Sequence, residues 1–195
     1  MAARYEEVGY ECLPDLIDLE ACERLSNCID ALDLCGPGSR NVLDHEWCRV
    51  TARELRAHPM VASMLPVSAV CAQCTHFVKD AHRNWGVSYH QDLSIPVGTR
   101  VDDPECAGWS EKEGIRYVQQ PTNLLADLVA VRVQLDDATS QSGPLRVIPR
   151  THRLGQISDE QISALRANQG EVERAAASQT IVRARSVPPP PRHQR

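Results

Sequence analysis

The sequence has few aromatic residues, no long apolar run and no excess of positive charge. Its 195 residues include only three Trp, four Tyr and one Phe, and no aromatic residue follows Tyr117. No apolar run approaches the about 20 residues that a membrane-spanning helix needs. The net charge of −5 argues against a general nucleic-acid-binding protein, which usually carries a basic face. The N-terminus also lacks the apolar stretch of a secretory signal. These absences predict a cytoplasmic protein with no membrane or nucleic-acid partner.

A second cysteine pair, which a structural zinc site usually needs, is also lacking. The chain has eight cysteines, but only Cys71 and Cys74 form a CxxC motif. Without a secretory signal, the cysteines are expected to be reduced thiols. We therefore expect Cys71 and Cys74 to be core-facing thiols on a strand or turn rather than zinc ligands.

Composition changes toward the C-terminus. The charge balance is negative before residue 150 and positive after it, and the chain ends with four consecutive prolines followed by Arg-His-Gln-Arg. Such a segment buries little apolar surface. We predict one folded domain over 1–170, with a helical part at 1–66 and a β-rich part at 67–170, and a basic, Pro-rich, disordered tail at 171–195.

Hydrophobic periodicity predicts the secondary structure of the domain. Ser158 followed by Gln161 has the spacing of a helix capping box. The predicted helices span 15–34, 46–57 and 159–168. The predicted strands span 67–79, 86–97, 115–120, 127–135 and 145–148, and a loop occupies 98–114. This order indicates an α+β protein, mainly β with N-terminal helices, and suits an antiparallel barrel of the jelly-roll kind.

The residues that could carry chemistry are His90 and Asp92. Alternation along the predicted strand puts both on one face and directs Gln91 to the other, where its role is expected to be structural. Two histidines and one carboxylate form the facial triad of non-haem Fe(II) oxygenases. On spacing alone, a histidine packed in the sheet or facing solvent is the commoner interpretation. Five of the eight aromatic residues lie in the 41 residues around the motif, which favours a site there.

Four segments together resemble the phytanoyl-CoA dioxygenase family. They are NWGVSYHQDLSIPV at 84–97, GWSEKEG at 108–114, LVAVRVQLDDATSQSGPLRVIPRTHRLG at 128–155 and the helix that begins SDEQI. The resemblance is strong over about 70–160 and absent from the last 25 residues. It implies a double-stranded β-helix that binds Fe(II) and uses 2-oxoglutarate and O₂ as co-substrates. The implied reaction hydroxylates a small organic molecule and releases succinate and CO₂.

The resemblance also implies roles for individual residues. His90 and Asp92 match the first two iron ligands, while Thr75 and Arg132 fall where the family lines its co-substrate pocket. Trp109 either closes the substrate side or caps the core. Two further candidates are Lys79, which would attract a carboxylate or face solvent, and His152, which is expected to satisfy backbone carbonyls rather than bind iron.

The sequence departs from the family after about Gly170. The family's distal iron-binding histidine, and the arginine that clamps 2-oxoglutarate beyond it, have no clear counterparts, so the third iron ligand is unknown. After His152 the only histidine is His193, two residues before Arg195. This departure predicts a C-terminally truncated chain that binds Fe(II) weakly and turns over 2-oxoglutarate slowly or not at all. Two alternatives stay open: a catalytically inactive relative and a non-catalytic jelly-roll binding module.

Overall fold

The structure is a computed structural model of the 195-residue chain. It describes residues 2–32, 34, 36, 38–78, 86–136, 145–168, 173–174 and 179–184. In these residues the helices are α1 (Ala2–Val8), α2 (Leu19–Asp30), η1 (Val42–Asp44), α3 (Glu46–Ala57), α4 (Pro59–Ala62), α5 (Thr122–Leu125), η2 (Thr151–Arg153) and α6 (Asp159–Asn168). None of the helices in the described residues is long and apolar enough to cross a membrane.

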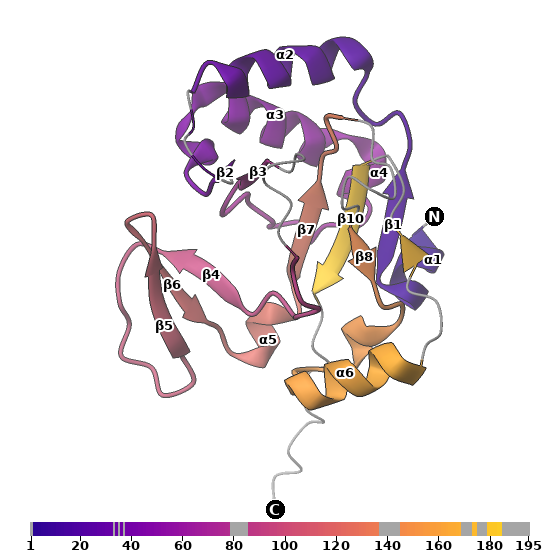
Figure 1. Ribbon diagram of the computed structural model, residues 1–195, viewed down its shortest axis with the longest axis vertical. Helices are drawn as coiled ribbons and strands as arrows, with labels where there is room; N and C mark the ends of the chain where they lie inside the picture. Colours follow the sequence, from indigo (N-terminus) through magenta and orange to yellow (C-terminus); the bar gives the residue numbers. More distant parts are fainter. Residues whose placement is uncertain are drawn as a thin grey trace, which may run out of the picture.

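The strands form small antiparallel sheets (Figure 1). They are β1 (Tyr10–Leu13), β2 (Gly38–Ser39), β3 (His76–Phe77), β4 (Ser94–Val97), β5 (Ala107–Lys112), β6 (Ile115–Gln119), β7 (Leu128–Arg132), β8 (Arg146–Val147), β9 (Glu173–Arg174) and β10 (Gln179–Ala184). Two sheets have three strands, in the orders β1-β10-β7 and β4-β6-β5, and two have the pairs β2-β3 and β8-β9. The predicted combination of helices with antiparallel β-structure is confirmed, while closure into a double-stranded β-helix stays a prediction.

The hydrophobic core packs the N-terminal segments against the β1-β10-β7 sheet. Tyr5 of α1, Leu13 of β1, Val61 of α4 and Met64 form a buried cluster. Partly buried hydrophobic residues pack against this cluster, including Val129 and Val131 of β7. Burying such side chains is worth about 1.5–3 kcal/mol each, so this cluster fixes where β7 and its neighbours lie.

The predicted helices are largely confirmed. The helix predicted at 15–34 is shorter, because Asp18 caps the N-terminus of α2 by accepting the Ala21 N–H at 2.7 Å. The helices predicted at 46–57 and 159–168 are α3 and α6. The capping box is also confirmed: the Gln161 side chain accepts the Ser158 N–H at 2.8 Å, and the Ser158 hydroxyl accepts the Gln161 N–H.

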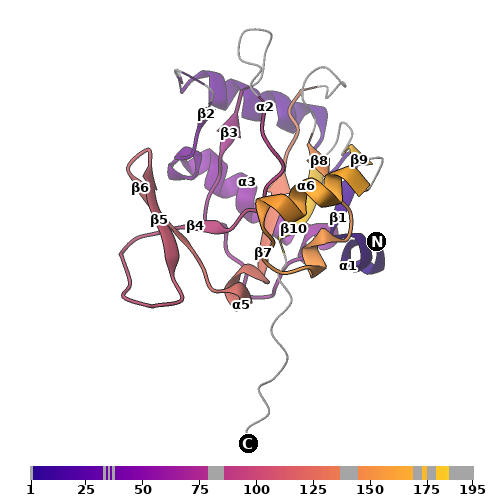
Figure 2. The same cartoon turned by 60° about the horizontal axis from the view of Figure 1, so that its bottom comes forward.

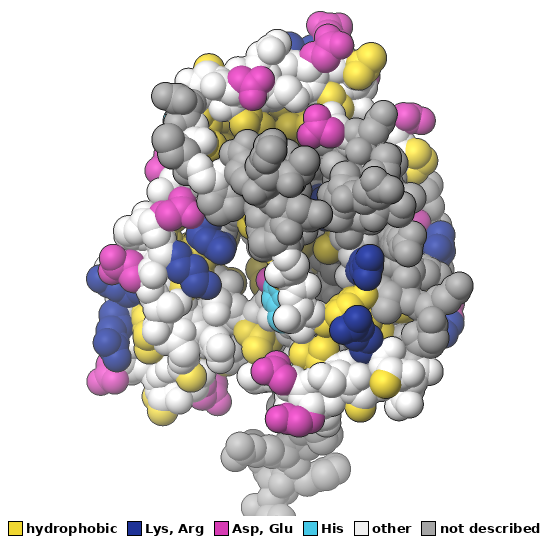
Figure 3. Space-filling model, viewed as in Figure 1, with side chains coloured by type: hydrophobic (Ala, Val, Ile, Leu, Met, Phe, Trp, Pro, Cys, Tyr) yellow, Lys and Arg dark blue, Asp and Glu magenta, His cyan; other side chains and the backbone are white. Residues whose placement is uncertain are grey.

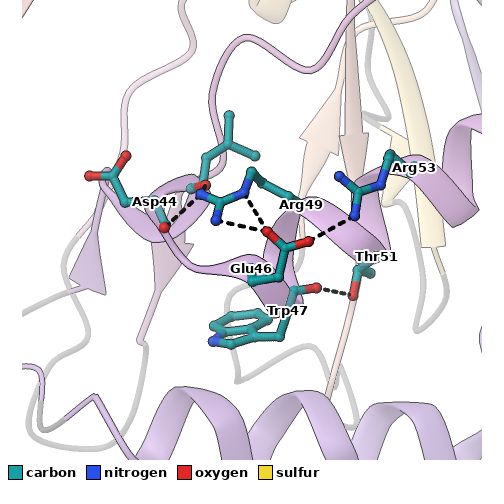
Figure 4. A network of polar contacts seen from close by, with 7 residues as sticks. Asp44, Glu46, Trp47, Arg49, Thr51 and Arg53 are labelled. Atoms are coloured by element: carbon teal, nitrogen blue, oxygen red, sulfur yellow. Dashed lines mark hydrogen bonds and ion pairs between the residues drawn. The ribbon is translucent and has the colours of Figure 1, made fainter.

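A polar network fixes the start of α3 (Figure 4). Arg53 and Arg49 both donate to the Glu46 carboxylate, and their hydrogen bonds and charge hold its pKa below the ordinary value. Arg49 also donates to the Leu43 and Asp44 carbonyls of η1. One guanidinium therefore ties η1 to the first turn of α3.

The strand predictions need correction in two places. Of the strand predicted at 67–79, only β3 and a bridge between Cys74 and Asn41 form in the described residues, and Val67 and Val70 are exposed. Of the strand predicted at 86–97, only β4 pairs within the described part of the chain, with β6, so 86–93 is a connection rather than a strand there. Part of the loop predicted at 98–114 is in fact β5.

Residues predicted to belong to the tail form strands. β10 lies between β1 and β7 and pairs with both, with Val182 opposite Tyr10 and Ala130. β9 pairs with β8. The predicted disordered tail at 171–195 is therefore wrong for 173–174 and 179–184, because pairing with distant strands supplies the backbone hydrogen bonds that the local composition does not suggest.

Candidate metal site

His90 and Asp92 lie in the connection 86–93 that leads into β4. Their side chains come together: His90 Nε2 lies 3.6 Å from Asp92 Oδ1. The imidazole is 57 % and the carboxylate 69 % exposed, so both are open to solvent. The predicted pair therefore shares one side of the chain although the predicted strand does not form there.

The hydrogen bond of His90 to Ser88 suits metal binding. Its Nδ1 lies 2.7 Å from the Ser88 carbonyl oxygen, and because a carbonyl can only accept, Nδ1 carries the proton. Nε2 is the ring nitrogen that faces the Asp92 carboxylate. A histidine that donates one ring N–H to a carbonyl and binds metal through the other nitrogen is the usual arrangement in metal sites.

The separation of the two ligand atoms also fits one cation. Nitrogen and oxygen ligands lie about 2 Å from a first-row metal, which places two neighbouring ligand atoms about 3 Å apart at right angles. The observed 3.6 Å needs only a small adjustment.

No group of three or more His, Cys, Asp or Glu side chains able to hold a metal occurs in the described part of the chain. Predicted residues Lys79, His193 and Arg195 lie outside the described residues.

Tyr89 and Gln91, on either side of His90, contact α6 and the turn before it. The Gln91 side chain hydrogen-bonds to the backbone of residues 155 and 157, and the Arg166 guanidinium of α6 lies 5.6 Å from the centre of the Tyr89 ring. α6 lies below β8 and β10 in Figure 1 and in front of β10 in Figure 2. The predicted structural role of Gln91 is thus borne out by its hydrogen bonds.

Arg132 is a candidate anion-binding residue. It lies at the end of β7, where burial lowers the pKa of its guanidinium. Among the described residues its hydrogen-bond partner is the neutral Gln134 amide, at 2.9 Å. A half-buried cation without a carboxylate partner in this part of the structure has unused capacity for a carboxylate ligand.

Thr75 connects to a surface hollow that the sequence did not predict. Its hydroxyl accepts a hydrogen bond from the Gln73 amide at 2.6 Å. Gln73 lines a hollow of about 300 Å³ together with Arg40, Asn41, Asp44, Pro96 and Ile115. These residues come from four separate segments, so no local motif could have indicated the hollow.

Trp109 lies on the β4-β6-β5 sheet, where Lys and Arg side chains gather beside acidic ones (Figure 3). Two cation–ring contacts occur in this part of the chain: Arg100 is 5.2 Å from the centre of the Trp109 ring, and Lys112 is 5.1 Å from that of Tyr117. The contact with Arg100 stabilises the orientation of the indole. Whether Trp109 closes a substrate site stays a prediction.

His152 has the structural role that the sequence predicted. It is 7 % exposed in η2, and its Nε2–H donates to the Glu6 carbonyl of α1 at 3.1 Å. Arg153 donates to the same carbonyl at 2.6 Å. His152 therefore satisfies a backbone carbonyl at the end of α1.

The CxxC prediction is partly wrong, because Cys71 is exposed rather than core-facing. Cys74 is half-buried, and its thiol hydrogen-bonds to that of Cys48, which is buried on α3. The described cysteines form no disulfide. Cys74 thus packs against α3 beside a second thiol.

Comparison with known proteins gives one family. The family model of phytanoyl-CoA dioxygenase (PhyH) matches residues 5–184, from within α1 to the end of β10. No curated protein and no solved structure matches the chain. The match extends beyond Gly170, so the predicted loss of the family pattern at that point is wrong.

Proposed function

Since the chain belongs to the phytanoyl-CoA dioxygenase family, we propose that it is an Fe(II)- and 2-oxoglutarate-dependent dioxygenase that hydroxylates a small organic substrate in the cytoplasm. The observation that carries the proposal is the pair of His90 and Asp92, with Nε2 3.6 Å from Oδ1 and Nδ1 held by Ser88. The proposed fold is the family's double-stranded β-helix, over the domain at 1–170 together with β10.

Each candidate residue has a proposed role. His90 Nε2 and Asp92 would hold the iron, which supplies oxidation of a substrate C–H bond by O₂ coupled to conversion of 2-oxoglutarate to succinate and CO₂. Arg132 would bind a carboxylate of 2-oxoglutarate, since its half-buried guanidinium presents a two-pronged donor. Thr75 and Lys79 are proposed to line the same pocket, and Trp109 to border the substrate.

A second candidate function is a non-catalytic family member that binds a metal or a small acid without turnover. It is favoured by the two protein ligands that the described residues bring together, where the facial triad has three. The two functions share the same site and differ only in product release.

The test is succinate release in the presence of Fe(II), ascorbate, 2-oxoglutarate and O₂. We expect release that requires Fe(II) and falls to background in His90→Ala and Asp92→Ala. The matched control is His45→Ala, because His45 stacks on Trp47 and lies outside the proposed site. Fe(II) binding without release, lost in the same two variants, would establish the second function. Release that is equal in all four proteins, or neither binding nor release, would contradict the proposal.

A further inference from the structure

The connection 86–93 forms no strand pairing with the other described residues, although it carries the proposed metal pair. Pairing begins only at Ser94, opposite Gln119. The side chains that bind a metal need a fixed geometry. Neighbouring residues provide it by packing against these side chains and forming hydrogen bonds. Something other than a β-ladder must therefore hold His90 and Asp92 in place.

Gln91 supplies such a support. Its Nε2 donates to the Gly155 carbonyl at 2.7 Å, and its Oε1 accepts the Ile157 N–H at 2.9 Å. Both ends of the amide are thus bound to the backbone of one turn. When the NH₂ group and the oxygen of a side-chain amide both form hydrogen bonds, the side chain has one rotamer and the amide one orientation.

The turn that receives Gln91 is itself held on both sides. Gly155 has φ +69, a left-handed conformation that glycine adopts without strain, and it links η2 to α6. On the other side the capping box of Ser158 and Gln161 fixes the first turn of α6. The Gly155 carbonyl and the Ile157 N–H therefore stand at defined positions.

The direction of Gln91 sets the direction of its neighbours. Gln91 is half-buried against the turn, whereas His90 and Asp92, one residue away on each side, are exposed and lie together. The contact between Tyr89 and Arg166 of α6 adds a second attachment on the same segment. Losing the Gln91 hydrogen bonds would free both ligands to separate.

We infer that Gln91 is the positioning residue of the metal pair: it clamps the connection 86–93 to the turn 155–157 so that His90 Nε2 and Asp92 Oδ1 face one cation. The inference rests on the proposed metal site and adds to it a link between that site and α6. Gln91 does not touch the metal in this role, and its amide acts through the two residues beside it.

The test measures Co(II) binding by visible absorption, because the Co(II) spectrum reports both affinity and ligand geometry. Gln91→Met keeps the length of the side chain and removes both hydrogen bonds. Thr51→Val is the control, since it also removes a hydrogen bond from a part-buried side chain to the backbone, but on α3 rather than at this turn. We expect Gln91→Met to lower Co(II) affinity about 10–100-fold, as the loss of outer-shell partners does, and to alter the spectrum.

Three outcomes are distinguishable. Wild-type affinity and spectrum in Gln91→Met would overturn the inference, and so would an equal loss in Thr51→Val at a matched melting temperature. If His90→Ala binds Co(II) as tightly as the wild type, the proposed metal site itself is wrong. A thermal melt of each variant separates lost positioning from lost folding, because only positioning changes the spectrum of a protein that remains folded.

Discussion

Gly9 lies directly against the imidazole of His152. A Cβ built on Gly9 would overlap the ring, 2.7 Å from its Cγ, and the φ of Gly9 is +90. Two further contacts join the same segments: the Arg150 N–H donates to the Val8 carbonyl at 2.8 Å, and its guanidinium pairs with Glu7 at 2.7 Å. The junction of α1 and β1 therefore packs closely against η2, which lies more than 140 residues later in the chain.

The first prediction follows from that contact. Gly9→Ala should lower the free energy of unfolding by about 2–5 kcal/mol, because overpacking costs about 1–3 kcal/mol and a left-handed conformation about 1–2 kcal/mol for residues with a Cβ. Gly114→Ala is the control, since Gly114 has φ +76 but nothing within 4 Å of an added Cβ. Urea unfolding measures both. Equal losses would show that the His152 contact contributes nothing.

The second prediction concerns Glu113, in the turn between β5 and β6. Its carboxylate accepts from the Ser39 hydroxyl at 3.1 Å and from the Arg40 N–H at 2.8 Å. Glu113→Ala should lower the free energy of unfolding by about 1 kcal/mol, below the usual range for hydrogen bonds to charged groups because the side chain is 40 % exposed. Glu111→Ala, an exposed position of the same hairpin, should change it little. A Glu113→Ala protein as stable as Glu111→Ala would contradict this attachment.

The third prediction concerns the Cys74 thiol. Burial and the neighbouring Cys48 raise its pKa from 9.0 to about 12. The folded protein should therefore resist alkylation of Cys74 by iodoacetamide at pH 8, while the exposed Cys71 reacts faster. Because the folded-state pKa is raised, this thiol should also lower stability as pH rises from about 9 toward 12, the window between the two values. Peptide mass spectrometry checks the labelling, and equal rates for Cys74 in buffer and in urea would contradict the burial.

The fourth prediction tests Arg132 as a carboxylate-binding residue. Arg132→Lys should weaken 2-oxoglutarate binding to the Fe(II)-loaded protein about 10–100-fold, since lysine cannot form the bidentate contact and a hydrogen bond between charged groups is worth about 1.5–3 kcal/mol. Anaerobic calorimetry measures the dissociation constant. Arg116→Lys, at an exposed position of β6, is the control. An unchanged constant in Arg132→Lys would remove Arg132 from the co-substrate site.

Local patterns predicted helices α2, α3 and α6 and strands β6, β7 and β8, but they failed over much of 67–79 and 86–97 and missed β10. The capping box of Ser158 and Gln161 lies within one turn, and the hydrophobic spacing of α3 lies within one helix. Such local features can be recognised from the sequence alone. The connection 86–93 looked like a strand because its residues suit one, but its support comes from Gln91 across more than 60 residues. The strand β10 was missed for the same reason, since its partners β1 and β7 are distant in sequence.

The sequence predicted that His90 and Asp92 lie on one side of the chain, but it did not predict what surrounds them. His90 and Asp92, two residues apart in sequence, lie together although the predicted strand does not form there. The hydrogen bond from His90 to Ser88 and the hollow beside Gln73 depend on the three-dimensional path of the chain. Neither has a signature that a residue pattern could show.

Anaerobic equilibrium dialysis of Fe(II) tests the central claim most directly. The account predicts about one Fe(II) per chain in the wild type and in His45→Ala, with affinity at least about 10-fold weaker in both His90→Ala and Asp92→Ala, because loss of a ligand costs no less than loss of an outer-shell partner. Circular dichroism of each variant establishes that it is folded. Fe(II) bound equally well by folded His90→Ala and Asp92→Ala would contradict the assignment of this pair as the metal site.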